Sequence, residues 1–285
     1  MFKFYIPIFY LIHSRLKTKF DLISWQIIFL IPQFAVTYFY LHTISDIFVQ
    51  LFLISQLVFH TLYEIGYIEN DVITTRDEKK PTLRLNKKSI AYLKKNYSNV
   101  IYFKYIISIF FIGILYWIDS FTPYRLNLEA FLALLVFNRL IFFIHNSIRN
   151  RFNIFTFFIL SAIKYTFPLV LFVSFETMLL PIILMILIFP FLRTIEIFTL
   201  KKHKFKKIAN LVNNIDSFRV MYYLLCAIGL VVTWYFSLMS NNNFQIFIFI
   251  AFYFLLFRMA TKFLIKKGVY KRDAKTKTNS QYPIK

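Results

Sequence analysis

Acidic residues gather in one stretch of this chain, which holds its best candidates for chemistry. Only 13 of the 285 residues are Asp or Glu, and five of them lie between Glu64 and Glu78. The stretch follows an apolar segment and leads into a basic one. Because a carboxylate at a membrane border is costly, such a cluster is a functional candidate by default.

Oxygen-bearing side chains in this stretch have a spacing that suits a metal site. Asp71, Thr74 and Glu78 are spaced i, i+3, i+7, so they share one face if the helix continues past the membrane border. Two carboxylates and the amide oxygen of Asn70 suit Mg²⁺, which leaves its other positions to water and a substrate phosphate. We therefore predict Asp71 and Glu78 as catalytic and, with Asn70, as metal ligands. The alternative is a solvated helix end whose acids pair with neighbouring cations.

Basic residues surround these acids and could neutralise a diphosphate. Arg84 is the best candidate for a two-point contact, because a guanidinium can donate two parallel hydrogen bonds. Pro81 disfavours helix for the residue before it and helps to end the element. The predicted phosphate-binding residues of this loop are Arg76, Lys80 and Arg84.

Glu196 is the acidic candidate at a second basic loop. It is the only acid in its segment, and it lies three residues after Arg193. One interpretation makes Glu196 a catalytic metal ligand that faces the first cluster, with Lys201 and Lys202 binding phosphate. The other interpretation is a structural ion pair between Arg193 and Glu196.

Lys164 is a cation deep in an apolar segment, about twelve residues from the start of that segment. A lone ammonium in that position must pair, face a cavity or extend towards the interface. We predict that Lys164 binds a substrate phosphate.

The composition identifies a membrane protein. Hydrophobic residues make up 59% of the chain, more than a soluble domain can bury. The single cysteine, Cys226, excludes an intrachain disulfide. The segment from Phe4 to His13 is too short to cross a membrane and is predicted as an interfacial helix. Windows of about 20 apolar residues can cross, and the predicted spans are 22–41, 47–67, 98–118, 127–147, 152–174, 177–198, 219–239 and 244–264.

The Lys and Arg residues lie almost entirely on one side of these spans. The termini and the connections after spans two, four and six carry them, whereas the opposite connections offer only Arg125. Because positive charge is retained in the cytoplasm during insertion, both termini and the candidate loops are predicted to be cytoplasmic, in the inner membrane of the cell. The net charge of +21 is therefore attributed to topology and to anionic lipid head groups, not to nucleic acid.

We predict a single membrane-embedded domain over residues 1–285. It would include a cytoplasmic or interfacial segment at 1–21 and a basic, disordered cytoplasmic tail at 265–285. The two long basic loops are separated by four spans, which suggests two similar four-helix halves. Long loops in a compact protein are usually functional or disordered.

The acidic stretch resembles the first motif of the UbiA-type intramembrane prenyltransferase superfamily. That motif, N-D-x-x-D-x-x-x-D, follows the family's second transmembrane helix and leads into a basic segment with Pro and Arg. Asn70 and Asp71 match its first two positions, Thr74 stands where the middle Asp belongs, and Glu78 stands in for the last Asp. The family's second motif is matched only by Glu196. The run from His145-Asn146 to Arg149, and then Lys164, resembles the family's polar-x-x-x-basic element and the cation one helix later, which adds Arg149 to the phosphate-binding residues.

The resemblance implies an all-α bundle with a central cavity, built of eight spans here and usually nine in the family. It implies Mg²⁺-dependent transfer of a prenyl group from a polyprenyl diphosphate to a polar or aromatic acceptor, with release of diphosphate. Metal and basic residues would stabilise the leaving group, and an apolar cavity would exclude water. One alternative is transfer of phosphoribosyl from phosphoribosyl diphosphate to a polyprenyl phosphate. Another is a lipid-binding or transport protein with a decayed site.

Overall fold

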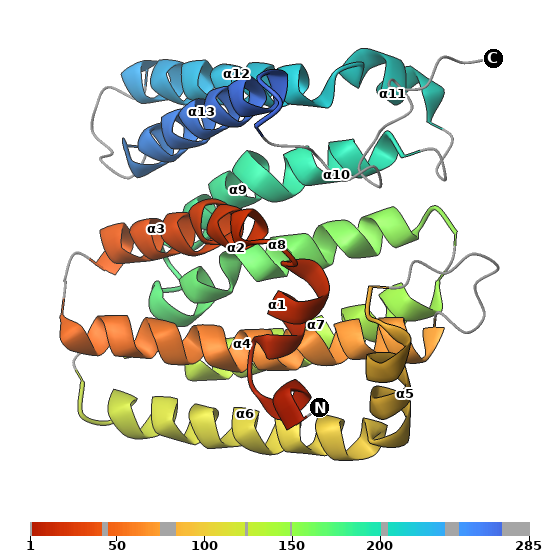
Figure 1. Cartoon of the computed structure of the whole chain (residues 1–285). Coiled ribbons are helices and arrows are strands. Elements are labelled where there is room, and N and C mark those ends of the chain that lie inside the picture. The colour runs from red at the N-terminus through yellow and green to blue at the C-terminus, as the bar shows by residue number, and fades with distance from the viewer. Residues whose placement is uncertain are drawn as a thin grey trace. The chain divides into compact units, whose positions relative to one another are not determined.

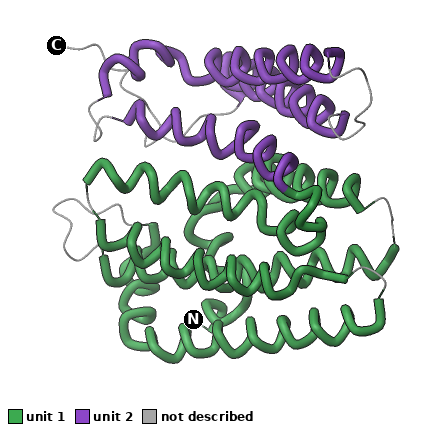
Figure 2. Tube along the Cα trace, turned by 180° about the vertical axis from the view of Figure 1, so that it is seen from behind, with its two compact units in different colours: residues 1–178 green, residues 179–285 purple. Residues whose placement is uncertain are grey.

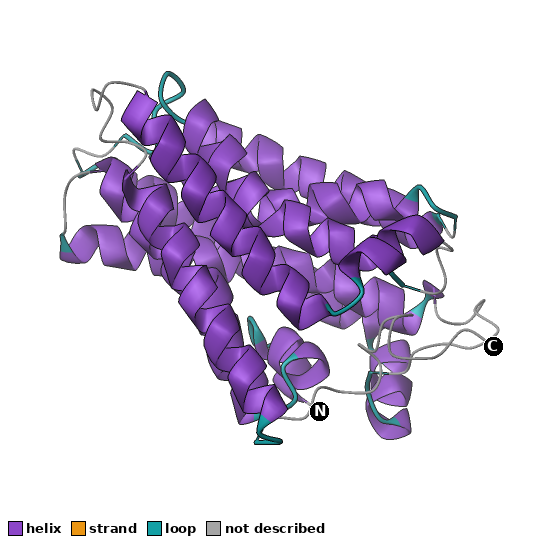
Figure 3. Ribbon diagram, turned by 90° about the horizontal axis from the view of Figure 1, so that it is seen from above, coloured by secondary structure: helices purple, strands orange, loops and turns teal. Residues whose placement is uncertain are grey.

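The computed structural model describes residues 2–41, 45–74, 84–122, 125–148, 150–200, 205–236 and 245–269. In these ranges the chain forms helices and no strands, as Figure 3 shows. Eight of the helices are long and apolar enough to cross a membrane. The prediction of an all-α polytopic membrane protein with eight spans is therefore confirmed, whereas the central cavity stays a prediction.

The chain divides into two compact units, coloured separately in Figure 2. Unit 1 comprises residues 1–178 and unit 2 residues 179–285. The division falls after five of the eight span-length helices, not after four as the two basic loops suggested. The single domain predicted for residues 1–285 stays a prediction.

Unit 1 is built around α4, the longest of the described helices, which packs against α6 and α7 (Figure 1). α7 also packs against α8, and α8 contacts α3. The first span joins α2 and α3 through a π-helical turn, η2. The helices of unit 1 are α1 (Phe9–Arg15), α2 (Lys19–Trp25), η2 (Gln26–Leu30), α3 (Ile31–Leu41), α4 (Asp46–Val72), α5 (Lys87–Lys95), α6 (Tyr97–Asp119), α7 (Leu128–Ser147) and α8 (Asn153–Phe172), preceded by the 3-10 turn η1 (Phe2–Tyr5).

Unit 2 contains three spans. The first is continuous from α9 through the π-helical turn η4 to α10, and α12 and α13 pack along each other. Between α12 and α13, the Tyr223 and Phe254 rings stack with centroids 5.1 Å apart. The elements are α9 (Leu179–Ile186), η4 (Leu187–Phe191), α10 (Leu192–Phe198), α11 (Lys206–Val212), α12 (Ile215–Phe236) and α13 (Gln245–Lys266).

Local sequence signals set several helix starts in unit 1. Thr18 and Asp21 form a capping box at the start of α2, with each side chain accepting a hydrogen bond from the other's backbone N–H. Ser45 and Asn86 cap α4 and α5 by accepting from the backbone N–H three residues later. These caps satisfy N–H groups that have no partner inside their own helix.

A proline in α8 frees a carbonyl that another helix then satisfies. Pro168 lies one turn after Lys164 and has no N–H to donate to the Lys164 carbonyl. Gln33 of α3 supplies the donor instead, with its Nε2 2.8 Å from that oxygen. Gln56 of α4 donates in turn to Oε1 of Gln33 at 3.2 Å. Three helices are thereby joined at the backbone of Lys164.

Gly66 allows α4 and α7 to approach closely. A Cβ atom at this position would lie 2.3 Å from Cδ1 of Phe142. The Phe142 ring is itself held edge-on against Tyr63 and Tyr67. One turn further along α7, Nδ2 of Asn146 donates to the Gly66 carbonyl at 3.1 Å. The contact therefore requires a residue without a side chain.

Gly66→Ala is expected to destabilise the protein by about 1–3 kcal/mol, because the added methyl overpacks a rigid contact. Gly113→Ala is the matched control, since nothing lies within 4 Å of a Cβ at that position of α6. Because Ala has a higher helix propensity than Gly, Gly113→Ala should raise the free energy of unfolding by up to about 1 kcal/mol. Melting temperatures of the purified variants in detergent test the contrast, and equal shifts for the two variants would contradict it.

Candidate functional site

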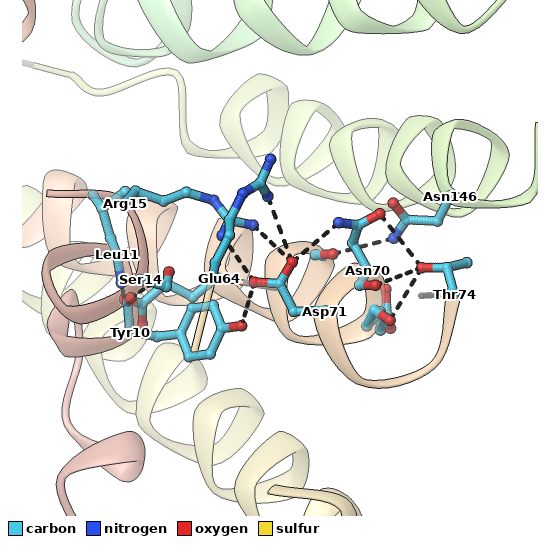
Figure 4. A network of polar contacts seen from close by, with 12 residues as sticks. Tyr10, Leu11, Ser14, Arg15, Glu64, Asn70, Asp71, Thr74 and Asn146 are labelled. Atoms are coloured by element: carbon cyan, nitrogen blue, oxygen red, sulfur yellow. Dashed lines mark hydrogen bonds and ion pairs between the residues drawn. The ribbon is translucent and has the colours of Figure 1, made fainter. Parts of the chain in front are cut away.

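Asp71, in the last turn of α4, accepts hydrogen bonds from two residues of α1 and from Arg84, which precedes α5 (Figure 4). Its Oδ2 accepts from the Tyr10 hydroxyl at 2.8 Å and from Nη1 of Arg15 at 2.8 Å. Its Oδ1 accepts from Nη2 of Arg15 at 3.2 Å and, more loosely, from Nη1 of Arg84 at 3.5 Å. Arg15 is therefore bound in the two-point manner that fixes guanidinium geometry.

Asn70 and Thr74 complete the hydrogen bonding around Asp71. Asn70 donates from Nδ2 to Oδ1 of Asp71 at 3.1 Å. Thr74 donates to the Asn70 carbonyl at 2.9 Å and so satisfies one of the last carbonyls of the helix. The shared face was predicted on the condition that the helix continues through these residues, but α4 ends at Val72. Thr74 therefore lies beyond the helix and does not share a helical face with Asp71.

The segment that carries Tyr10 and Arg15 is anchored by a second buried carboxylate. Oε2 of Glu64 accepts from Nζ of Lys104 at 2.7 Å, and Oε1 accepts from the backbone N–H of Leu11 at 2.6 Å. Glu64 and Lys104 are 1% and 0% exposed. The residue before α1 offers no side-chain cap, so Glu64 of α4 satisfies an N–H in the first turn of α1.

The charges at Asp71 are unequal in number. Burial and the neighbouring Asp71 carboxylate raise the pKa of the Tyr10 phenol, so this group keeps its proton and donates it in a hydrogen bond. Burial and the neighbouring Arg15 guanidinium lower the pKa of Arg84. Two guanidinium groups therefore share one carboxylate, and the local balance favours anions.

Lys164 lies among aromatic rings of unit 1. Its Nζ is 4.5 Å from the ring centroid of Phe29, in the π-helical turn η2, and 5.7 Å from that of Tyr63. Such contacts are weakly attractive for a cation. Within the described ranges, no carboxylate lies at ion-pair distance from this ammonium. π-Helical turns are frequent at functional sites.

One face of α4 connects Lys164 with the Asp71 cluster. Tyr63, Tyr67 and Asp71 are spaced i, i+4, i+8 along this helix, so they lie above one another on one face. The two tyrosine rings meet edge to face with centroids 5.1 Å apart. The Arg15 guanidinium lies 4.4 Å from the Tyr67 ring centroid. Cationic groups therefore lie at both ends of an aromatic strip.

Glu196, in α10 of unit 2, is also held by two arginines. Arg219 of α12 donates from Nε to Oε1 and from Nη2 to Oε2, the latter at 2.8 Å. Arg193 donates from Nη1 to Oε2 at 2.5 Å. The Arg193–Glu196 ion pair that the sequence offered as an alternative is therefore present, and Arg219 joins it. Glu196 is 3% exposed.

The described donor atoms do not form a magnesium site. Mg²⁺ needs oxygen lone pairs directed at it, whereas the carboxylates of Asp71 and Glu196 both accept from guanidinium groups and Asn70 turns its NH₂ group to Asp71. In the described ranges, no group of three or more His, Cys, Asp and Glu residues is placed to hold a metal ion. Mg²⁺ stays a prediction, because Glu78 lies outside those ranges.

The structure places only part of the predicted phosphate-binding set. Arg84 contacts Asp71 of α4. Lys164 of α8 contacts Tyr63, which lies on the same face of α4 as Asp71. The other predicted residues lie outside the described ranges; they are Arg76, Lys80, Arg149, Lys201 and Lys202.

Sequence reasoning missed the partners of the buried carboxylates. Lys104 lies inside a predicted span, so the rule that flagged Lys164 as a costly embedded cation applies to it equally. Arg15 looked topogenic among other N-terminal cations, and no sequence signal distinguished it. The residues missed were Tyr10, Arg15, Lys104 and Arg219.

Comparisons with known proteins found no matching family model, no matching curated protein and no matching solved structure.

Proposed function

We propose that this protein is a membrane-embedded transferase that moves a prenyl group from a polyprenyl diphosphate to a polar or aromatic acceptor. The observation that carries the proposal is the face of α4, with the Asp71 cluster at its end and Lys164 beside Tyr63 further along. Cations and aromatic rings are thus arranged along one strip in a protein that otherwise presents apolar helices. The family resemblance of the Asn70–Asp71 stretch is consistent with this arrangement.

The chemistry of such a transfer needs what this strip offers. Breaking the bond between the allylic carbon and the diphosphate oxygen places negative charge on the leaving group and positive charge on the carbon. N–H groups of Arg84 and Lys164 would stabilise the diphosphate. The electron-rich faces of Phe29 and Tyr63 would stabilise the allylic cation, as they do the Lys164 ammonium. Apolar surroundings would keep water from reacting with the cation.

The direction of the site follows from the charge pattern. Outside the predicted spans, Lys and Arg lie almost entirely in the termini and connections on the same side of the membrane as the Asn70–Asp71 stretch. On the positive-inside rule, we place this stretch at the cytoplasmic face of the membrane. A soluble substrate would then enter from the cytoplasm, and the polyprenyl chain would remain in the lipid.

Release of diphosphate by the purified protein tests the proposal. Protein in lipid nanodiscs is given geranyl or farnesyl diphosphate and a panel of aromatic and lipid-phosphate acceptors, and product is followed by mass spectrometry. A prenylated acceptor that forms in step with diphosphate supports the proposal. Product formed only from phosphoribosyl diphosphate and polyprenyl phosphate would replace it with phosphoribosyl transfer. No turnover with any pair, but saturable polyprenyl phosphate binding, would indicate a lipid-binding protein.

A further inference from the structure

Each unit contains a buried carboxylate that binds two arginines, and in unit 2 Asp216 also lies 3.8 Å from Arg219. In unit 1, Asp71 binds Arg15 through two nitrogens and Arg84 through one. In unit 2, Glu196 binds Arg219 through two nitrogens and Arg193 through one. Each carboxylate is almost completely buried.

The two arginines of each cluster differ in exposure. The two-point partners, Arg15 and Arg219, are 14% and 12% exposed. The one-point partners, Arg84 and Arg193, are 38% and 43% exposed. A guanidinium has five N–H groups, and within the described part of the chain each one-point partner uses only its Nη1 on an acid. Most N–H donors of Arg84 and Arg193 are therefore available to a ligand.

We propose that Asp71 and Glu196 are arginine-positioning residues, and that Arg84 and Arg193 bind phosphate groups directly, without a magnesium ion between protein and ligand. The ligand class is a diphosphate or a related phosphate ester. Its identification with the diphosphate of a prenyl donor rests on the function proposed above. The binding chemistry itself requires only the two clusters.

Charge and geometry both support direct binding. Planar guanidinium groups match phosphate oxygens through paired hydrogen bonds. Arg15 and Arg84 bind the same carboxylate, and burial together with the Arg15 charge lowers the pKa of Arg84, so an incoming anion would relieve repulsion between like charges. A divalent cation placed at Asp71 would instead meet those two positive groups. The arrangement therefore selects an anion over a metal ion.

Binding of inorganic pyrophosphate in EDTA tests the inference. Calorimetry on the purified full-length protein should give saturable binding in EDTA, without added Mg²⁺. Arg84→Gln and Arg193→Gln should each weaken binding at the cluster that carries the substitution about tenfold. Arg125→Gln is the matched control, because it removes the same charge from an exposed residue outside both clusters. Binding that disappears in EDTA, or equal Kd values for all three variants, would overturn the inference.

Variants of Asp71 separate positioning from metal ligation. Asp71→Asn keeps an oxygen acceptor for the arginines and removes a negative charge beside the ligand, so pyrophosphate should bind equally or more tightly. Asp71→Ala removes the acceptor and should weaken binding severalfold. A metal ligand predicts the opposite for Asp71→Asn, namely loss of binding together with loss of any Mg²⁺ dependence. Melting temperatures identify variants that fail to fold. Arg84→Lys keeps the positive charge, so it should bind pyrophosphate more tightly than Arg84→Gln.

The ligand source and the proposed function are tested separately. If phosphatidylglycerol in mixed micelles binds at these arginines and pyrophosphate does not, the site recognises lipid head groups, and its assignment to diphosphate fails. Pyrophosphate binding in EDTA without prenyl transfer would retain this inference and remove the proposed function. Prenyl transfer with strictly Mg²⁺-dependent pyrophosphate binding would retain the proposed function and remove this inference.

Discussion

Lys104→Met is expected to destabilise the protein by about 3–5 kcal/mol, because it leaves the buried carboxylate of Glu64 without its cation. The pair joins α6 to α4, and Glu64 also satisfies the N–H of Leu11 in α1. Loss of Lys104 should therefore loosen the N-terminal segment as well as the bundle. Reversible unfolding in mixed detergent–SDS micelles measures the free energy, and hydrogen exchange at residues 9–15 measures the local effect.

The double variant Lys104→Met with Glu64→Gln distinguishes charge from packing. The introduced amide would keep an oxygen for the Leu11 N–H but carry no buried charge. Replacing both ions of a buried pair is often close to neutral, so the double variant should recover at least half of the loss. If the double variant is as unstable as Lys104→Met alone, an uncompensated charge is not the cause.

Lys164→Met is expected to have the opposite profile, with a loss of activity and no loss of stability. The Lys164 ammonium has aromatic rings but no carboxylate beside it in the described ranges, so the fold bears the cost of a lone embedded cation. Removing it should leave the free energy of unfolding unchanged or slightly higher. If Lys164 stabilises a leaving diphosphate, prenyl transfer should fall about 10²–10³-fold.

Turnover with a prenyl diphosphate, measured beside the unfolding free energy, decides this prediction. Lys164→Arg is the control that keeps the charge and should retain part of the activity. The same Lys→Met change at Lys104 gives the reference for a structural lysine. A Lys164→Met variant that loses stability as Lys104→Met does, or retains full turnover, would show that Lys164 has a structural role.

The acidic stretch between Glu64 and Glu78 was predicted only in part from the sequence. Its position at the end of a membrane span was predicted, and α4 ends there at Val72. The cations that pair with its acids were not predicted. Glu64, Glu69 and Asp71 contact Lys104, Arg139 and Arg15, which are 40, 70 and 56 residues away. Pairing with the neighbouring basic loop describes only the looser contact of Asp71 with Arg84.

The sequence by itself determined the class of protein, the number of spans and their approximate limits. These follow from a local requirement, since a helix that crosses lipid needs about 20 mostly apolar residues in one window. Only the tertiary structure decided which cation meets which acid. That choice depends on how each helix is rotated and which helices are neighbours, and it is fixed by contacts such as Gly66 against Phe142. Because no local window contains those contacts, the arginine clusters at Asp71 and Glu196 were visible only in the folded chain.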